Sequence, residues 1–311
     1  MLPFDESAAK NISTTEATRR DADLLKVANW FYGQVDFEER IGEALRQSID
    51  EVLDGQRTGR FDIANLEKTE KTYLGTKVEI VIRSAFGLQR GKVMDYVVAG
   101  QEVDSKFTSG NYWTIPGEAH GHICLLTSAD DKSSRFRAGL VRIHHNLLNG
   151  GKNRDGKQSL SAQGRGSILW LTEAGQLPVN VLLSLPVDTC ALITGHRNGQ
   201  QRTNELFRHV QGQLIHRSTV LTVARQDDGL KRVRDARKHL SSEGIIILGH
   251  QGKHPGMASD LGLPVPASGS WIAARVVPVP SGSPRPHTTV GGKTYAIAMS
   301  SEGSRPGPTV Y

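Results

Sequence analysis

The spacing of the apolar residues changes near Lys92, and this change limits what the first half of the chain can fold into. Before it, apolar residues recur every three or four positions over residues 24–32 and 41–53, which predicts amphipathic helices. A further helix is expected from about Thr72 to Phe86, because Gly87 is a suitable residue to end it. The folded part of the chain is therefore expected to begin with helices.

Beyond this point the apolar residues follow the period of strands. Residues 93–98 and 103–107 are expected to form two strands around a turn at residues 99–101. Residues 122–126 and 138–143 are expected to form two more. Helices followed by a run of strands indicate an α/β domain built around one sheet.

Residues 146–166 are rich in Asn, Gly, Ser, Lys and Arg, which predicts a surface loop before a domain boundary near residue 170. The chain has 311 residues, enough for two domains, and we expect them to span residues 1–172 and 173–311. Residues 1–20 show no apolar periodicity and are expected to be a loose tail.

The second half has its own pattern of elements. The expected elements are a helix with an apolar face at Leu206, Phe207, Val210 and Leu214, a short helix over residues 220–225 capped by Ser218-Thr219, a turn at 226–229, a helix to about Leu240, and strands at 245–248, 271–277 and 295–299. This order is typical of an α+β winged helix-turn-helix module, with the helix-turn-helix over about residues 204–250.

The positive charge of the chain is concentrated in the second half. Residues 1–170 contain 23 Lys and Arg against 23 Asp and Glu, and residues 171–311 contain 15 against 9, so the whole net charge of +6 lies there. A local basic surplus indicates either a polyanionic partner, DNA before membrane, or simply a soluble basic surface.

Several cellular settings are disfavoured by the sequence. No apolar run approaches the roughly 20 residues that a membrane-spanning helix needs, and the polar start lacks the core of a signal peptide. The two cysteines, Cys124 and Cys190, lie far apart and have no metal-site spacing. We therefore expect a cytoplasmic protein without disulfides and without membrane attachment.

The strongest chemical pattern combines carboxylates and a lysine. Asp104 and Lys106 are two positions apart on one expected strand, so their side chains project from the same face. Asp95 lies on the neighbouring expected strand, and Glu79 on the preceding helix can bring a third carboxylate to the same end of the sheet. The alternative is a purely structural role, in which Asp104 and Lys106 form a salt bridge on a solvated strand face. The neighbouring apolar Val103 makes a fully solvated face less favourable.

Hydrolysis of a phosphodiester requires these residue types. Carboxylate oxygens bind Mg²⁺, which keeps several waters and also binds the scissile phosphate. The metal lowers the pKa of a bound water, and a nearby lysine can orient or deprotonate that water. We therefore expect Glu79, Asp95 and Asp104 to be metal ligands and, with Lys106, the catalytic residues.

Other motifs are weaker. His120 and His122, like His144-His145, have no fixed third ligand, so structural or surface roles are expected for them. Val52-Leu-Asp-Gly resembles the nucleophile motif of DNA ligases, but Val52 stands where the lysine would be, and a turn at Asp54-Gly55 is expected instead. The sequence has neither a dinucleotide-binding glycine pattern nor a Walker lysine.

The expected helix that ends near Leu240 is strongly basic. Lys231, Arg234 and Lys238 share its outer face at positions i, i+3 and i+7, opposite an apolar stripe. An isolated run of this kind is usually a solvated surface, but here it follows a turn and a short helix, the position of a recognition helix in the major groove. The expected DNA-binding residues are Lys231, Arg232, Arg234, Arg237 and Lys238.

Long segments from about residue 52 to about residue 277 resemble the NaeI-type restriction endonucleases. These segments are residues 54–60, 68–72, 78–80, 103–107, 121–125, 204–208, 226–228, 243–251, 260–266 and 273–278. The resemblance implies a PD-(D/E)xK nuclease domain with a mixed sheet, followed by a helix-turn-helix domain. It carries the catalytic positions onto Glu79, Asp95, Asp104 and Lys106, with Met94 in place of the motif's proline.

The resemblance also implies a biological activity. It indicates a Mg²⁺-dependent type IIE enzyme that cuts double-stranded DNA at GCCGGC, as a homodimer that is activated by a second bound DNA site. Two alternatives stay open. One is a helix-turn-helix regulator with a degenerate nuclease fold, and the other is a strand-joining enzyme related to ligases or topoisomerases.

Overall fold

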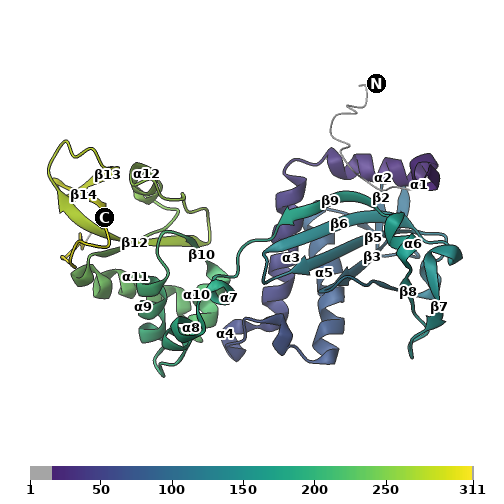
Figure 1. The fold of residues 1–311 in the computed structure, drawn as a ribbon, viewed down its shortest axis with the longest axis horizontal. Helices are drawn as coiled ribbons and strands as arrows, with labels where there is room; N and C mark the ends of the chain where they lie inside the picture. The colour runs from purple at the N-terminus through teal and green to yellow at the C-terminus, as the bar shows by residue number, and fades with distance from the viewer. Residues whose placement is uncertain (1–15, 310–311) are drawn as a thin grey trace. The chain divides into compact units, whose positions relative to one another are not determined.

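The computed structural model describes residues 16–309 and divides into two compact units (Figure 1). Of the described residues, the first unit contains 16–52 and 63–179, and the second contains 53–62 and 180–309. The predicted boundary at 172/173 falls inside strand β9 (Leu169–Gln176), which pairs with β6 (Arg135–Arg142) of the first unit. The first unit therefore continues past the predicted boundary.

The first unit contains a six-stranded sheet in the order β1-β2-β3-β5-β6-β9. Its remaining strands are β1 (Gln89–Arg90), β2 (Tyr96–Val98), β3 (Gln101–Thr108) and β5 (Ile123–Asp130). Strands β3 and β5 are parallel and the other neighbours are antiparallel, so the sheet is mixed. Positive φ angles at Ala99 and Gly100 turn the chain tightly between β2 and β3.

Helices of the first unit lie against its sheet (Figure 1), with α5 next to β3 and α2 next to β6 and β9. They are α1 (Glu16–Arg20), α2 (Ala22–Tyr32), α3 (Phe37–Leu53) and α5 (Lys68–Phe86). Helix α5 begins four residues earlier than predicted, because the Glu70 carboxylate accepts a hydrogen bond from the backbone N–H of Glu67 at 2.8 Å and caps the helix there. It ends at Gly87, as predicted.

The prediction of a loose tail over residues 1–20 is wrong for its last five residues, and residues 1–15 lie outside the described part. Residues 16–20 form α1, and the Thr18 hydroxyl donates a hydrogen bond to the carbonyl of Ser167 at 3.0 Å. This buried bond attaches the segment to the body of the unit.

The prediction of a surface loop over residues 146–166 is also wrong. This segment contributes β7 (Leu148–Lys152), β8 (Gln158–Leu160) and α6 (Ala162–Gly166), and the two strands form a small sheet with β4 (Thr114–Ile115). Leu147, Leu148 and Leu160 are buried in a cluster with Trp113, so a few apolar residues in a polar segment are sufficient to fold it.

The second unit contains helices and a separate antiparallel sheet. Its helices are α4 (Gly55–Thr58), α7 (Val181–Ser184), α8 (Val187–Thr194), α9 (Gly199–His209), α10 (Arg217–Ala224), α11 (Gly229–Leu240) and α12 (His254–Asp260). Its strands are β10 (Leu214–His216), β11 (Ile245–Leu248), β12 (Ser270–Val279), β13 (His287–Val290) and β14 (Lys293–Ile297). Strand β12 is central, because it pairs with β10, β11 and β14.

Short 3-10 helices complete the elements of the described residues. They are η2 (Ile63–Asn65), η3 (Gly117–Ala119), η4 (His145–Leu147) and η5 (Ser241–Glu243). None of the helices within residues 16–309 has the length and apolar character to cross a membrane.

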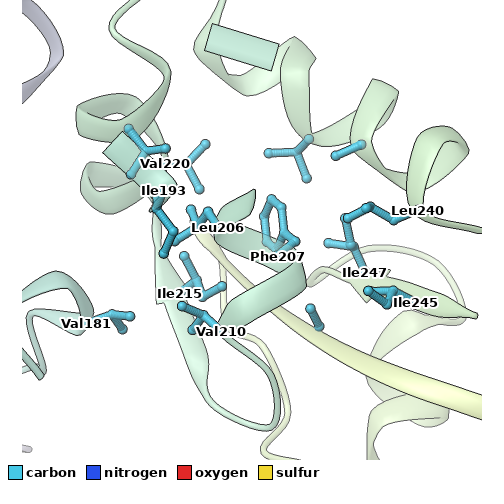
Figure 2. Close-up of a cluster of buried hydrophobic side chains, with 14 of the residues drawn as sticks. Val181, Ile193, Leu206, Phe207, Val210, Ile215, Val220, Leu240, Ile245 and Ile247 are labelled. Atoms are coloured by element: carbon cyan, nitrogen blue, oxygen red, sulfur yellow. The ribbon is translucent and has the colours of Figure 1, made fainter. Parts of the chain in front are cut away.

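Helices α9, α10 and α11 share one apolar core (Figure 2). Leu206 and Phe207 of α9 contact a buried cluster that also includes Val220 of α10, Leu240 of α11 and Ile247 of β11. Leu214, expected on the same helix as Leu206, instead lies in β10, because α9 ends at His209 and the chain turns at Gly212 with a φ of 73°.

A buried arginine fixes the turn between α10 and α11. Arg202 of α9 donates hydrogen bonds to the carbonyls of Val223 and Ala224 at 2.6 and 2.7 Å, and to those of His196 and Arg197 at 2.6 and 2.9 Å. The first two carbonyls belong to the last turn of α10, where the helix itself supplies no donor.

Replacing Arg202 by Met is therefore expected to destabilise the second unit by at least about 2 kcal/mol, because buried carbonyls lose their donors. Urea unfolding measures the effect. Arg197→Met removes the same charge from an exposed position and is expected to change stability by less than about 0.5 kcal/mol. Equal effects of the two substitutions would contradict this role of Arg202.

Candidate active site

Strand β3 places Asp104 and Lys106 together on one face of the first unit's sheet. Their side chains form an ion pair, with 2.6 Å between Lys106 Nζ and Asp104 Oδ2. The Asp104 side chain is 7% exposed and that of Lys106 is 22% exposed. The pair is therefore largely removed from water but still open on the lysine side, which a substrate can reach.

Asp95 lies beside this pair, although not on a strand as predicted. It immediately precedes β2, whose first residue, Tyr96, pairs with Val103 of β3. Asp95 Oδ2 accepts a hydrogen bond from the backbone N–H of Ser105 at 2.7 Å. This bond holds the Asp95 carboxylate next to the segment between Asp104 and Lys106.

Glu79 reaches the same region from helix α5. Its carboxylate contacts the guanidinium of Arg83, one turn later, at 3.4 Å. The buried Tyr96 hydroxyl donates a hydrogen bond to the backbone carbonyl of Glu79 at 2.9 Å and so ties α5 to β2. Helix and sheet together therefore position the third carboxylate.

The carboxylates repel one another. Burial raises the pKa of Glu79 above its ordinary value and the negative charge of Asp95 raises it further, while Arg83 opposes both. Burial also raises the pKa of Asp104, against the lowering effect of Lys106. Gathered acidic groups of this kind are typical of sites that bind a cation or move a proton.

This repulsion has a consequence for stability. Because the folded protein raises the pKa of Glu79, ionising Glu79 costs stability as pH rises from the ordinary carboxyl range through the raised value. Glu79→Gln is therefore expected to be more stable than the wild type at pH 8 in EDTA, and to lose that advantage at acidic pH. Urea midpoints at both pH values measure the difference.

Glu51→Gln is the matched control within the same unit. The Lys77 ammonium, 2.6 Å away, holds the pKa of Glu51 below its ordinary value, so ionised Glu51 stabilises the fold above the ordinary carboxyl range. Its substitution is expected to lower stability slightly at pH 8. If Glu79→Gln is also less stable than the wild type at pH 8, ionised Glu79 does not destabilise the fold, and the proposed repulsion among the carboxylates is contradicted.

Three further residues support the site and were not predicted. Cys124 of β5 is buried, its Sγ lies 3.5 Å from Asp104 Oδ2, and burial raises the pKa of its thiol well above the ordinary value. The other two are Tyr96 and Arg83. Of the three, only Arg83 could have been predicted from the local sequence, since it stands four residues after Glu79 on the same helix and can pair with it.

The donor set suits a hard divalent cation that brings its own water. Within residues 16–309, no three His, Cys, Asp or Glu side chains are grouped closely enough to form a complete metal site. Mg²⁺ does not need such a cage, because it commonly takes one or two protein carboxylates together with waters and substrate phosphates. The carboxylates of Asp95 and Asp104 beside one another fit that requirement.

The basic helix α11 divides its predicted DNA-binding residues into two groups. Lys231, Arg234 and Lys238 are exposed. Arg232 is paired with Asp228 at 2.9 Å and bonded to Gln226 at 2.9 Å, and Arg237 Nε donates to the carbonyl of Ile247 at 2.8 Å. Arg232 and Arg237 therefore hold α11 against its neighbours. Away from this helix, the ring nitrogens of His120 and His145 contact each other at 3.2 Å.

Known proteins are similar in sequence to this chain across both compact units. The model of the family described as restriction endonuclease NaeI matches residues 26–306. The chain belongs to the NaeI restriction endonuclease family. The type II restriction enzyme NaeI of Lentzea aerocolonigenes is 44% identical over 291 residues, which cover 90% of this chain and 91% of that relative.

Membership in the NaeI family confirms the predicted activity at the level of a site-specific DNA endonuclease. The match begins before α3 and continues past β14, so it includes both compact units. The observed mixed sheet fits the α/β fold expected for such an enzyme.

Proposed function

We propose that the first unit is a PD-(D/E)xK nuclease in which Glu79, Asp95 and Asp104 bind Mg²⁺ and Lys106 acts on the attacking water. The observation that carries the proposal is the buried Asp104 carboxylate, paired with Lys106 at 2.6 Å and flanked by Asp95. When bound, the metal would supply Lewis-acid stabilisation of the phosphate and a more acidic water.

The side chains of this site have separate tasks. Asp104 and Asp95 provide the negative charge that draws the cation to the end of the sheet. Glu79, whose pKa is raised by burial and by the charge of Asp95, completes the acidic set from α5. Lys106 holds Asp104 in place in the free protein, and its ammonium can stabilise the developing charge on a phosphate oxygen.

The second unit is proposed to bind DNA as a winged helix-turn-helix. Its order α9-β10-α10-α11-β11-β12, with β12 between β10 and β11, supports this assignment. Lys231, Arg234 and Lys238 on the exposed face of α11 are proposed to contact DNA, while Arg232 and Arg237 orient the helix. The basic surplus of the second half agrees with a polyanionic partner.

Three finer assignments follow the family resemblance. We propose that the recognition sequence is GCCGGC, that the enzyme works as a homodimer, and that a second DNA site activates it. A cytoplasmic location is proposed because the DNA substrate lies there.

Digestion of a plasmid with Mg²⁺, followed by sequencing of the fragment ends, tests the proposed function. Discrete fragments that end within GCCGGC are expected, and EDTA is expected to prevent their formation. Specific binding without cleavage would favour a helix-turn-helix regulator instead. Relaxed, covalently closed circles would indicate a strand-joining enzyme.

The basic helix makes a separate prediction about salt. Replacing Lys231 and Arg234 together by Ala should reduce the slope of log affinity against log salt by about 1.8, since each lost phosphate contact removes about 0.9. Fluorescence anisotropy over a salt series measures the slope. The control, Lys293→Ala with Arg305→Ala, removes the same charge from exposed positions off this helix and should leave the slope unchanged. An unchanged slope in the α11 variant would rule out phosphate contacts by these residues.

A further inference from the structure

Beyond the proposed catalytic residues, the same face of the sheet carries a second polar group of side chains. Asp104, Lys106 and Thr108 alternate along β3. Thr108 pairs in register with Ser128 of β5, and Ser128 pairs with Arg137 of β6. Arg137 therefore lies on the face that bears Lys106. Strand geometry puts the two Cα atoms about 12 Å apart, because they are offset by about 7 Å along the strands and by about 10 Å across two strand spacings.

The Arg137 guanidinium is held in a fixed orientation. It lies 5.8 Å from the ring centre of Trp113 and 5.5 Å from that of Trp170. One of its terminal nitrogens donates to Asn111 Oδ1 at 2.6 Å, and its Nε contacts Ser128 Oγ at 3.4 Å. A guanidinium has five N–H donors, so the group keeps donors for a ligand while its plane is set by the protein.

The guanidinium opens into a pocket of about 300 Å³. The polar residues that line it include Asn111, Ser128, Asp130, Arg135, Arg137 and Glu173. Glu173 is exposed, and the Asp130 carboxylate accepts hydrogen bonds from the Ser133 hydroxyl and backbone, which lower the pKa of Asp130. The pocket thus combines two guanidiniums, of which that of Arg137 is fixed, with two carboxylates.

This combination suits a base edge better than a phosphate. The two carboxylates of the lining offset the attraction of the two guanidiniums for a phosphate. The major-groove edge of a G·C pair instead presents both acceptors, on guanine, and a donor, on cytosine. A planar guanidinium held in place matches guanine O6 and N7 in a bidentate contact. A separation of about 12 Å corresponds to between three and four base-pair steps of about 3.4 Å, which is within reach of a short recognition site.

We propose that Arg137 reads a guanine in the DNA sequence cut by this enzyme. The inference rests on the proposed placement of the nuclease site in the first unit. It gives that unit a specificity contact of its own, apart from the proposed recognition helix α11. Asn111 and Ser128, with the rings of Trp113 and Trp170, are positioning residues for this contact.

The test pairs protein variants with 7-deazaguanine, which lacks the N7 acceptor. Duplexes carry the mapped cleavage site with each guanine replaced in turn on both strands, and affinity in Ca²⁺ and kcat/KM in Mg²⁺ are measured. One of these replacements is expected to lower the affinity and kcat/KM of the wild type about 10- to 100-fold. Arg137→Ala is expected to lower both by the same factor on unmodified DNA. Arg137→Ala should not respond further to that replacement, because the two changes remove the same contact.

Controls separate this role from charge and from folding. Arg137→Lys keeps the charge but not the fork, so it should not restore discrimination. Arg135→Ala removes the same charge from the same pocket and should keep the wild-type response to 7-deazaguanine. Equal weakening of Arg137→Ala on specific and random DNA, or a full response of this variant to 7-deazaguanine at every position, would overturn the proposal. A wild type that cuts no specific sequence would overturn it together with the proposed function.

Discussion

Asp104→Asn is expected to reduce DNA cleavage by at least about 10³-fold, the scale of losing a group that stabilises charge in the transition state. The substitution keeps the size of the side chain but removes the negative charge that pairs with Lys106 and, as proposed, binds the cation. Single-turnover cleavage of a duplex with one site measures the loss.

DNA affinity separates this effect from misfolding. Removing a carboxylate reduces repulsion with the phosphates, so Asp104→Asn should bind the same duplex in Ca²⁺ at least as tightly as the wild type. Asp155→Asn, an exposed position in the turn between β7 and β8, is the matched control and should cleave within about twofold of the wild type. Wild-type cleavage by Asp104→Asn would show that Asp104 is not a catalytic residue.

Lys106→Met is expected to lower the cleavage rate by about 10²- to 10⁴-fold, the range typical of a group that transfers or orients a proton. It also leaves the buried Asp104 without its ion-pair partner, so the pKa of Asp104 should rise further. The acidic limb of the pH–rate profile should therefore move to higher pH in this variant. Rates from pH 5.5 to 9 measure both effects.

Lys106→Arg distinguishes chemistry from charge pairing. Arginine restores a cation next to Asp104 but stays protonated and carries a planar fork. If Lys106 acts on the attacking water, this variant should remain at least about 10²-fold slower than the wild type. Recovery of wild-type rates in Lys106→Arg would reduce Lys106 to an electrostatic partner of Asp104. Lys132→Met, on an exposed turn, controls for loss of positive charge.

The local part of the site could be predicted from sequence. Asp104 and Lys106 are two residues apart on a strand, and this spacing alone puts them on one face. The turn at Ala99-Gly100 brings β2 back along β3, so Asp95 was also expected nearby. These inferences needed only the strand period and a short connection.

The remainder depends on contacts between distant segments. The approach of Cys124 to Asp104 follows from the parallel register of β3 and β5, which no local pattern encodes. Arg137 reaches this face only because β6 pairs with β5, and its aromatic neighbours come from two further segments. The polar composition of residues 146–166 predicts a loop, but tertiary burial of three leucines outweighs that composition and folds the segment.

The sequence also could not show which basic residues of α11 are free to contact DNA. The outward positions of Lys231, Arg234 and Lys238 follow from the helical period, and the structure has them exposed. Their neighbours Arg232 and Arg237 looked equivalent in sequence but are engaged with Gln226, Asp228 and Ile247. Charge counting finds such a helix, and only the packing around it separates contact residues from supporting ones.

The central claim is that Glu79, Asp95, Asp104 and Lys106 form one cleaving unit, and a double-mutant cycle tests it most directly. Single-turnover cleavage of one mapped site is measured for Asp95→Ala, Lys106→Ala and the double variant, with affinity in Ca²⁺ as the folding control. Residues that act as a unit are strongly non-additive, so the double variant should be no more than a few-fold slower than the slower single variant. Multiplied losses, or wild-type cleavage by either single variant, would contradict a single shared site.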